Sequence, residues 1–322
     1  MFCIKPTSLE PYFNIAAEEY FLKNINEDIF MLWRNSPSII VGKHQNTLGE
    51  VNHPYIREKG IKVVRRLSGG GTVFHDLGNV NFTFVRSGDK GKLVDFKKFT
   101  QPIIETLKLM GAPAYHSGRN DLLIDGLKIS GNAEHVYKDK VLHHGTLLFS
   151  SNLGNLNEAI KVDLDSYQDK SVKSFRSKVT NIADYLNEKM SVETFIDSVF
   201  ESVSRNFDDA EIYTPSQYDI DQINELVETK YSTWEWNYAY SPNYELKRRS
   251  SKNGITTEWN MAVQKGSIKA LTIVHPDNAF AKIMEQSLIG KLLVYAEIEI
   301  FLQQINYPDA PLSTEELMSL IF

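Results

Sequence analysis

The sequence predicts an α+β protein with a largely antiparallel sheet. Short apolar runs typical of strands are interrupted by helical patterns, and several runs are joined by short turns instead of helical crossovers. Asp125-Gly126 and Lys265-Gly266 are turns of this kind, because glycine accepts the backbone angles that tight hairpins need. Strands joined by such turns pair antiparallel, so the sheet should be mostly antiparallel.

Each element follows from a local pattern. Helices are predicted where apolar side chains recur at helical spacing, as in residues 96–110, which end at Gly111. Strands are predicted where short apolar or β-branched runs lie between turn residues. The predicted helices are 11–24, 54–59, 96–110, 191–206, 217–229, 278–289, 291–303 and one near the C-terminal end. The predicted strands are 29–33, 38–41, 62–66, 72–74, 80–85, 121–124, 127–137, 141–150 and a hairpin within 256–274. Residues 29–33 and 38–41 are expected to form a hairpin across Asn35-Ser36-Pro37, and residues 152–207 to be mostly helical.

Two domains are expected. Aromatic residues gather at 234–238, and Ser241-Pro242-Asn243 then breaks the pattern. We therefore predict a large domain at 1–245 and a small α+β accessory domain at 246–322.

Composition excludes several classes of protein. The net charge is -6, the opposite of the balance that a general nucleic-acid binder carries. No apolar run approaches the length of a membrane span, and the N-terminal residues lack the pattern of a signal peptide. The one cysteine, Cys3, rules out an internal disulfide and a cysteine-based zinc site, and it favours a cytoplasmic location.

The most informative stretch runs from Arg65 to Phe84. Two arginines precede Gly69-Gly70-Gly71, and a strand pattern follows. Three glycines let the backbone approach a ligand and turn its N–H groups toward an anion, and arginine is a donor suited to carboxylate or phosphate. The stretch is not a P-loop or a dinucleotide fingerprint, since no Gly-Lys-Ser/Thr follows and no helix opens after the glycines. A glycine-rich hairpin on a basic surface is the alternative interpretation.

Polar residues near the second half of the predicted sheet are further candidates. Lys128 lies between Gly126 and Gly131, and strand alternation places it on one face with Ser130; a solvated strand lysine is the alternative. Asn120-Asp121 can hold a metal ion or a ribose, although an Asx turn explains it as well.

His143 and His144 are adjacent on a strand and so face opposite ways, which prevents joint binding of one ion. At least one of them is expected to be a packed, hydrogen-bonded histidine. Residues 174–181 are basic and polar, consistent with a phosphate contact, a protein contact or a solvated loop. No Ser-His-Asp order or Cys-His pair stands out, so we expect electrostatic activation of an anionic ligand instead of thiol catalysis.

Taken together, these stretches resemble the two-domain bacterial lipoate–protein ligases (lipoate–protein ligase A family). The matching segments, in the family's order, are Arg65 to Asn79, Ser117 to Asp121, Lys128 to Ala133, His143 to Leu148, Arg176 to Asn181 and Trp234 to Asn237. The resemblance implies a biotin/lipoate ligase catalytic domain, similar to class II aminoacyl-tRNA synthetases, with a small C-terminal domain. The implied enzyme activates lipoate with MgATP to lipoyl-AMP and transfers the lipoyl group to a lysine of apo lipoyl domains.

The resemblance also implies roles for individual residues. Lys128 is the implied catalytic residue, contacting the lipoate carboxyl group and the α-phosphate. The residues implied to bind ATP are Arg65, Arg66, Gly70, Gly71, Thr72, Val73, Phe74, Asn120, Asp121 and Lys128, with Asp121 also implied to contact Mg2+. The residues implied to bind lipoate are Ser68, Gly69, His75, Lys128, His144 and Gly145. The implied acceptors are a glycine-cleavage H protein and dehydrogenase acyltransferase subunits. No nucleic acid or membrane partner is expected, and we expect a monomer.

The chain departs from the family pattern at Glu134-His135, where Tyr-Arg is common, so a basic contact is missing or supplied differently. Three alternatives remain: an ATP-independent lipoyl or octanoyl transferase, a biotin ligase, and a non-catalytic lipoate-binding adaptor. The transferase would need a cysteine nucleophile and only Cys3 is available. The biotin ligase motif differs, and Lys128 argues against an adaptor. The motifs do not distinguish lipoate, octanoate and lipoamide as the acyl donor.

Overall fold

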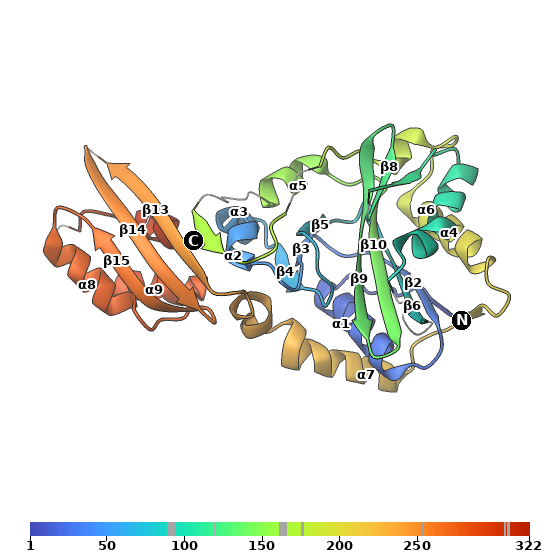
Figure 1. Cartoon of the computed structure of the whole chain (residues 1–322), viewed down its shortest axis with the longest axis horizontal. Helices are drawn as coiled ribbons and strands as arrows, with labels where there is room; N and C mark the ends of the chain where they lie inside the picture. The colour runs from blue at the N-terminus through green and yellow to red at the C-terminus, as the bar shows by residue number, and fades with distance from the viewer. Residues whose placement is uncertain are drawn as a thin grey trace.

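The computed structural model describes residues 1–88, 94–118, 120–160, 166–174, 177–252, 254–305, 307 and 310–322. A large body is built on one twisted sheet, and a smaller body formed by C-terminal residues lies beside it (Figure 1). The strands of the large sheet are β1 (Phe2–Ile4), β2 (Ile29–Trp33), β6 (Asn79–Ser87), β7 (Tyr115–Ser117), β8 (Asp121–Ile124), β9 (Leu127–Tyr137), β10 (Lys140–Leu148) and β12 (Glu211–Ile212). Their order is β12-β1-β2-β6-β10-β9-β8-β7. Only the pairs that β1 makes with β12 and β2 are parallel among these described strands, so the predicted α+β class is confirmed.

Helices cover both faces of this sheet. On one face, α4 (Phe96–Leu109) and α6 (Val192–Ser204) pack apolar side chains onto β6, β9 and β10. On the other face lies α1 (Pro11–Asn24), which shares a core with β2, and α7 (Gln217–Leu226) packs against α1. Pro11 suits the first turn of α1, where its missing N–H would have no helical partner. In the described part of the chain, none of the helices is both long and apolar enough to cross a bilayer.

A second, smaller sheet lies on the α1 side of the large one. It contains β3 (Ser38–Val41), β4 (Lys62–Arg65) and β5 (Val73–His75) in the order β4-β3-β5, and Ile40 and Val64 share a core with α1. The short helices α3 (His53–Glu58) and α5 (Leu153–Ala159) pack on its other side, and α2 (Thr47–Glu50) precedes α3 in the chain. The three glycines lie in the loop that joins β4 to β5, so this arrangement holds them over the large sheet.

The predicted hairpin of residues 29–33 and 38–41 is wrong, although both strands exist. β2 pairs with β1 and β6 in the large sheet, whereas β3 pairs with β4 and β5. The connection is anchored to the N-terminal segment instead, because Asn14 Nδ2 donates to Asn35 Oδ1 at 2.9 Å and the Ser36 N–H donates to the Leu9 carbonyl. The chain therefore steps from one layer to the other at this turn.

The smaller body is a four-stranded sheet packed against helices. It consists of β13 (Tyr244–Lys252), β14 (Ile255–Gln264), β15 (Ser267–Val274), α8 (Asn278–Leu288), α9 (Tyr295–Gln304) and α10 (Thr314–Ile321). Its fourth strand, β11 (Tyr167–Asp169), comes from the stretch predicted to be mostly helical, and it pairs with β13. That stretch also holds the 3-10 turn η1 (Ile182–Tyr185).

The chain passes between the two bodies more than once. After α7 come two π-helical turns, η2 (Val227–Tyr231) and η3 (Glu235–Ala239), which lead to β13. Because β11 belongs to the smaller sheet, residues before 245 contribute to both bodies, and the boundary at 245 stays a prediction.

Candidate active site

A cavity of about 350 Å³ lies between the large sheet, α1 and the glycine loop. Its floor crosses β2, β6, β10, β9 and β8, which are consecutive in the large sheet. Since adjacent strands lie about 4.8 Å apart, this floor is roughly 19 Å across.

The lining changes character along this floor. Over β2 and β6 the wall is mainly apolar and aromatic, formed by Ile15, Trp33, Ile40, Val73, His75 and Asn81. Over β9 and β8 it is mainly polar and charged, formed by Gly70, Gly71, Thr72, Asn120, Asp121, Lys128, Gly131, Asn132, Lys173, Ser174 and Ser177, with Ala133 and Val172 among them. His144, Gly145 and Thr146 of β10 lie between the two ends. The cavity therefore suits a ligand with an apolar tail and an anionic head.

Arg66 shapes the glycine loop from inside. Its Nη2 donates to the carbonyl oxygens of Gly69 at 2.6 Å and Gly71 at 2.8 Å, and its Nη1 donates to the Ile40 carbonyl at 3.0 Å. Gly70 lies between the two tethered carbonyls with φ 87°, a conformation that favours glycine. Burial lowers the pKa of Arg66 to about 10, so the guanidinium stays charged at neutral pH and adds positive potential to the cavity it lines.

Arg65 points the other way, which corrects its predicted contact with the nucleotide. Its guanidinium is fully buried outside the cavity and donates to the carbonyl oxygens of Gly42, Lys43, Gln45, Trp236 and Asn237 and to the hydroxyls of Thr47 and Ser241. Adjacent residues of an extended segment face opposite sides, so two neighbouring arginines cannot both line one cavity. Arg65 ties η3 and the loop after β3 to β4.

Lys128 reaches the cavity because β9 bulges beside it. The register with β8 shifts so that Leu122 pairs with Ser130 but Leu123 pairs with Lys128. As a result Lys128 lines the cavity together with Gly131, while Ser130 is fully buried, so the predicted common face of Lys128 and Ser130 is wrong. Bulges often re-aim a side chain in this way next to active sites.

Both the backbone and the ammonium group of Lys128 are held in place. The Lys128 N–H donates to the Lys178 carbonyl at 2.9 Å, and the Thr180 N–H donates to the Lys128 carbonyl at 3.0 Å. The ammonium group lies 2.8 Å from the Asp121 carboxylate, and both side chains remain partly exposed. A Cβ on Gly131 would come within 3.1 Å of Lys128 Nζ, so the absence of a side chain there leaves room for the amine.

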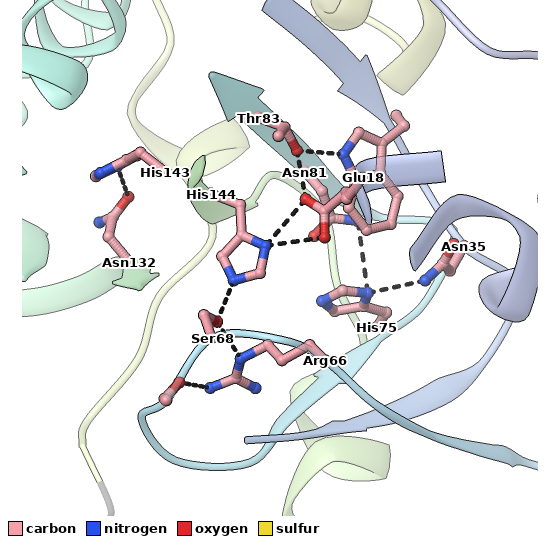
Figure 2. Close-up of polar contacts among 12 residues, drawn as sticks. Glu18, Asn35, Arg66, Ser68, His75, Asn81, Thr83, Asn132, His143 and His144 are labelled. Atoms are coloured by element: carbon pink, nitrogen blue, oxygen red, sulfur yellow. Dashed lines mark hydrogen bonds and ion pairs between the residues drawn. The ribbon is translucent and has the colours of Figure 1, made fainter. Parts of the chain in front are cut away.

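A directional hydrogen-bond chain joins α1 to the glycine loop (Figure 2). Arg66 Nε donates to Ser68 Oγ at 3.0 Å, and Ser68 Oγ lies 2.6 Å from His144 Nε2. His144 Nδ1 lies 2.9 Å and 3.0 Å from the two oxygens of Glu18, which also accepts from Thr83 Oγ1 at 2.6 Å. With the His144 ring proton on Nδ1, every donor in this series of hydrogen bonds has an acceptor. Both nitrogens of His144 are thus engaged within the protein, and the ring offers the ligand its surface.

A second network closes the polar end. Ser174 Oγ accepts from the Thr72 N–H at 2.9 Å and from Gln45 Nε2 at 3.1 Å, and it donates to buried Glu50. Thr72 Oγ1 in turn donates to Gln45 Oε1 at 2.9 Å. These contacts fix the residues after β11 against the glycine loop, and they bring Lys173 and Ser174 into the wall of the cavity.

His143 and Glu134 lie on the opposite face of the sheet, as alternation predicts. His143 is fully buried and stacks on Phe99, and its Nδ1 lies 2.8 Å from Glu134 Oε1. Burial lowers the pKa of His143 despite the nearby carboxylate. Glu134 is therefore committed to a buried pair. His135 is half-buried, and its pKa is lowered first by burial and then by the charge of Lys43.

Most of the predicted site residues gather at this cavity. Those that line it are Arg66, Gly70, Gly71, Thr72, Val73, His75, Asn120, Asp121, Lys128, His144 and Gly145. Ser68 and Gly69 are not among the lining residues, but both belong to the loop that Arg66 holds by hydrogen bonds. The Phe74 side chain packs with Ile39 and Val41 in a separate core, so only its backbone is left to contact the nucleotide, and that contact stays a prediction.

Several lining or supporting residues escaped the sequence analysis. In the sequence, Glu18 is typical of a residue on the polar face of an amphipathic helix, and Ile15 and Trp33 are typical of core residues. Ser174 lies in a stretch that the sequence singled out only in general terms. Arg119 and Arg176, which belong to the matching motifs, lie outside the described residues.

Comparison with known proteins agrees with this geometry. Residues 10–204 match the family described as the lipoyl protein ligase A/B catalytic domain. The chain is 36% identical over 321 residues to the lipoate-protein ligase LplJ of Bacillus subtilis, covering 97% of each chain. The chain belongs to the lipoate–protein ligase family.

Solved structures of similar proteins extend the match. The P. falciparum LipL1 structure in complex with lipoate is 25% identical with a TM-score of 0.62, covering 99% of this chain and 98% of that one. A lipoate-protein ligase A bound with ATP is 25% identical with a TM-score of 0.61, covering 73% and 97%. A bipartite ligase of Thermoplasma acidophilum, described with its E2 lipoyl domain, is 26% identical with a TM-score of 0.64, covering 73% and 95%. The ligase fold and the ligase function predicted from the sequence are confirmed.

Gly42 lies against the glycine loop of this ligase, and we expect Gly42→Ala to displace that loop. A Cβ at residue 42 would lie 2.1 Å from the Gly70 carbonyl oxygen, so the backbone of the loop would have to move. We expect about a hundredfold loss of ligase activity, because small displacements of positioning groups have effects of that size. Activity and the free energy of unfolding should be measured together.

Gly49→Ala is the matched control for this variant. Its added methyl group would make an ordinary contact, 3.4 Å from the Tyr167 ring, and alanine favours the short helix α2. Full activity in Gly42→Ala would contradict a rigid glycine loop.

Proposed function

We propose that this chain joins lipoate and ATP to give lipoyl-AMP and pyrophosphate, and then transfers the lipoyl group to a lysine of an apo lipoyl domain. The observation that supports this most directly is a continuous cavity whose lining passes from mainly apolar at β2 and β6 to mainly charged and polar at β9 and β8. Such a cavity matches an acid with a long apolar tail and a nucleotide at its carboxyl end.

The first step forms one bond and breaks one. A lipoate carboxylate oxygen bonds to the α-phosphorus of ATP, and the bond from that phosphorus to the bridging oxygen breaks as pyrophosphate leaves. Both reactants are anionic, so the step needs positive charge at their meeting point. Lys128 is placed to supply it, with the Arg66-held glycine loop offering backbone N–H groups to the phosphate.

We propose that Mg2+ enters with ATP. Among the described residues, no three His, Cys, Asp or Glu side chains form a metal cluster, and Asp121 is the one carboxylate that lines the described wall of the cavity. This donor set fits Mg2+, which binds through substrate phosphates and one or two carboxylates. Asp121 would hold the ion next to the phosphates, and the ion would neutralise part of their charge.

In the second step the nitrogen of the deprotonated acceptor lysine bonds to the acyl carbon and the bond from that carbon to the phosphate oxygen breaks. AMP leaves with the electron pair of that bond, and the nitrogen releases a proton to solvent. We propose that the acceptors are lipoyl domains such as those of glycine-cleavage H proteins and dehydrogenase acyltransferase subunits. We propose that the active form is a monomer. Free Cys3 is consistent with a cytoplasmic enzyme.

The position of Cys3 weighs against a thiol-dependent transferase. Cys3 is fully buried in the core beneath α4 and α6, and it does not line the cavity. A thiol in that position cannot reach an acyl group bound there.

The proposal is tested by incubating the protein with lipoate, MgATP and a panel of apo lipoyl domains. We expect pyrophosphate release that requires lipoate, and a mass increase of one lipoyl group on at least one acceptor. Chelating Mg2+ with EDTA should abolish both signals, and excess Mg2+ should restore them. Lipoyl transfer without ATP, or a lack of pyrophosphate with every acid offered, would contradict the proposal.

A further inference from the structure

His75 ends β5 at the apolar end of the cavity, and its tautomer is set by its neighbours (Figure 2). Its Nδ1 lies 3.1 Å from Asn35 Nδ2 and 3.5 Å from Asn81 Nδ2. The orientations of both amides are fixed independently, because Asn35 Oδ1 accepts from Asn14 and Asn81 Oδ1 accepts from Asn79, each at 2.9 Å. The amide nitrogens therefore donate to Nδ1, and the ring proton lies on Nε2.

This Nε2–H is a donor that lacks an acceptor among the described residues. The side chain is only 3% exposed, and Nε2 has no hydrogen-bond partner there. In Figure 2 this nitrogen points away from the asparagines, toward the side where Arg66 and His144 lie. Burial, together with Arg66 and His144, lowers the pKa of His75 to about 3, so the ring stays neutral with one proton to donate.

The other ring donors at this end of the cavity are already used. Trp33 Nε1 donates to Thr83 Oγ1 at 2.9 Å, and both nitrogens of His144 are engaged by Glu18 and Ser68. The remaining described wall is formed by apolar side chains such as Ile15 and Ile40, together with Asn81 and Arg66. A bound acyl chain thus meets a largely apolar wall in which His75 Nε2–H is a ring donor without an acceptor among the described residues.

Building on the proposed function, we propose that His75 Nε2–H hydrogen-bonds to a sulfur of the lipoate dithiolane ring and selects lipoate over acids that end in carbon. This donor is closed to solvent even without a ligand, so water does not satisfy it. A tail without an acceptor leaves it unpaired, which is costly, whereas a divalent sulfur is a weak acceptor that offsets part of the cost. A binding site built around a hydrogen bond rejects analogues that lack the partner.

The test compares lipoate with 5-cyclopentylpentanoate, in which two methylene groups replace the two sulfurs and the ring size is kept. For each acid, kcat/KM of pyrophosphate release is measured in the wild type, His75→Asn and His75→Gln. The asparagine amide reaches about as far as the Nδ1 position of the histidine ring and has no group at the Nε2 position. The glutamine amide nitrogen can lie near the Nε2 position. We expect the wild type to prefer lipoate, His75→Asn to lower that preference about fivefold or more, and His75→Gln to retain most of it.

A spectroscopic measurement on the wild type makes the test independent of variant folding. In nitrogen-15 spectra of the histidine rings, His75 should show the neutral tautomer protonated at Nε2, and lipoate should shift this signal more than the carbon analogue does. The inference would be overturned if the wild type used both acids equally well, or if folded His75→Asn kept the wild-type preference for lipoate. Equal shifts of the His75 nitrogen signal with the two acids would overturn it as well. If neither acid supports pyrophosphate release by the wild type, the proposed function itself fails.

Discussion

Lys128→Ala is expected to lower lipoate-dependent pyrophosphate release about a hundred- to a thousandfold, the loss typical of removing one group that stabilises charge in a transition state. Lys128 is the lysine of β9 that lines the cavity, and the bulge in that strand aims it there. Without its ammonium group, the lipoate carboxylate and the α-phosphate would meet with less of their repulsion cancelled. Transfer from supplied lipoyl-AMP to an acceptor should fall as well, since the phosphate is then the leaving group.

The same variant should remain folded. The backbone bonds of Lys128 to Lys178 and Thr180 do not involve its side chain, and Asp121 is exposed enough to be hydrated when its partner is removed. Lys138→Ala is the matched control, because Lys138 is exposed in the turn at the far end of the same strand pair. Pyrophosphate release by Lys128→Ala at the wild-type rate, with lipoate and MgATP saturating, would show that this amine has no part in the chemistry.

The sequence was sufficient to predict backbone conformation and side-chain direction at positions where one local pattern determines them. Gly70 has the positive φ that three successive glycines made possible, and His143 and His144 face opposite sides as strand alternation requires. Alternation applies equally to Arg65 and Arg66, and it would have separated the buried arginine from the one at the cavity. The motif resemblance assigned both to the nucleotide because it describes a run of residues, not the directions of their side chains.

Other features depend on contacts between distant segments, which local patterns do not contain. The bulge beside Lys128 is visible only in the pairing of β9 with β8, and Glu18 enters the site only because α1 packs against β10. β2 and β3 have the composition of a hairpin, but their partners lie far along the chain in different layers. The tautomer of His75 likewise depends on Asn35 and Asn81, which come from separate segments.

Arg65→Ala is expected to lower the free energy of unfolding by about 3 kcal/mol or more, because it leaves several buried acceptors without donors. The guanidinium is fully buried, and it donates to five backbone carbonyls as well as to the hydroxyls of Thr47 and Ser241. Burial lowers the pKa of Arg65 to about 10, so the group is still charged at neutral pH, and a charged donor makes stronger bonds to carbonyl oxygens. Urea denaturation of the variant and the wild type measures the difference.

Comparison with two other arginines separates this structural role from the ligand contact implied by the family motif. Arg205→Ala removes a side chain that is 79% exposed and should change stability little. Arg66→Ala should reduce activity strongly, because the Gly69 and Gly71 carbonyls lose their tether and the cavity loses a positive charge. If Arg65→Ala instead had wild-type stability and a raised KM for ATP, Arg65 would be a nucleotide-binding residue after all. We expect the reverse, since the seven oxygens that hold Arg65 lie outside the cavity and leave its guanidinium no free donor to turn toward a phosphate.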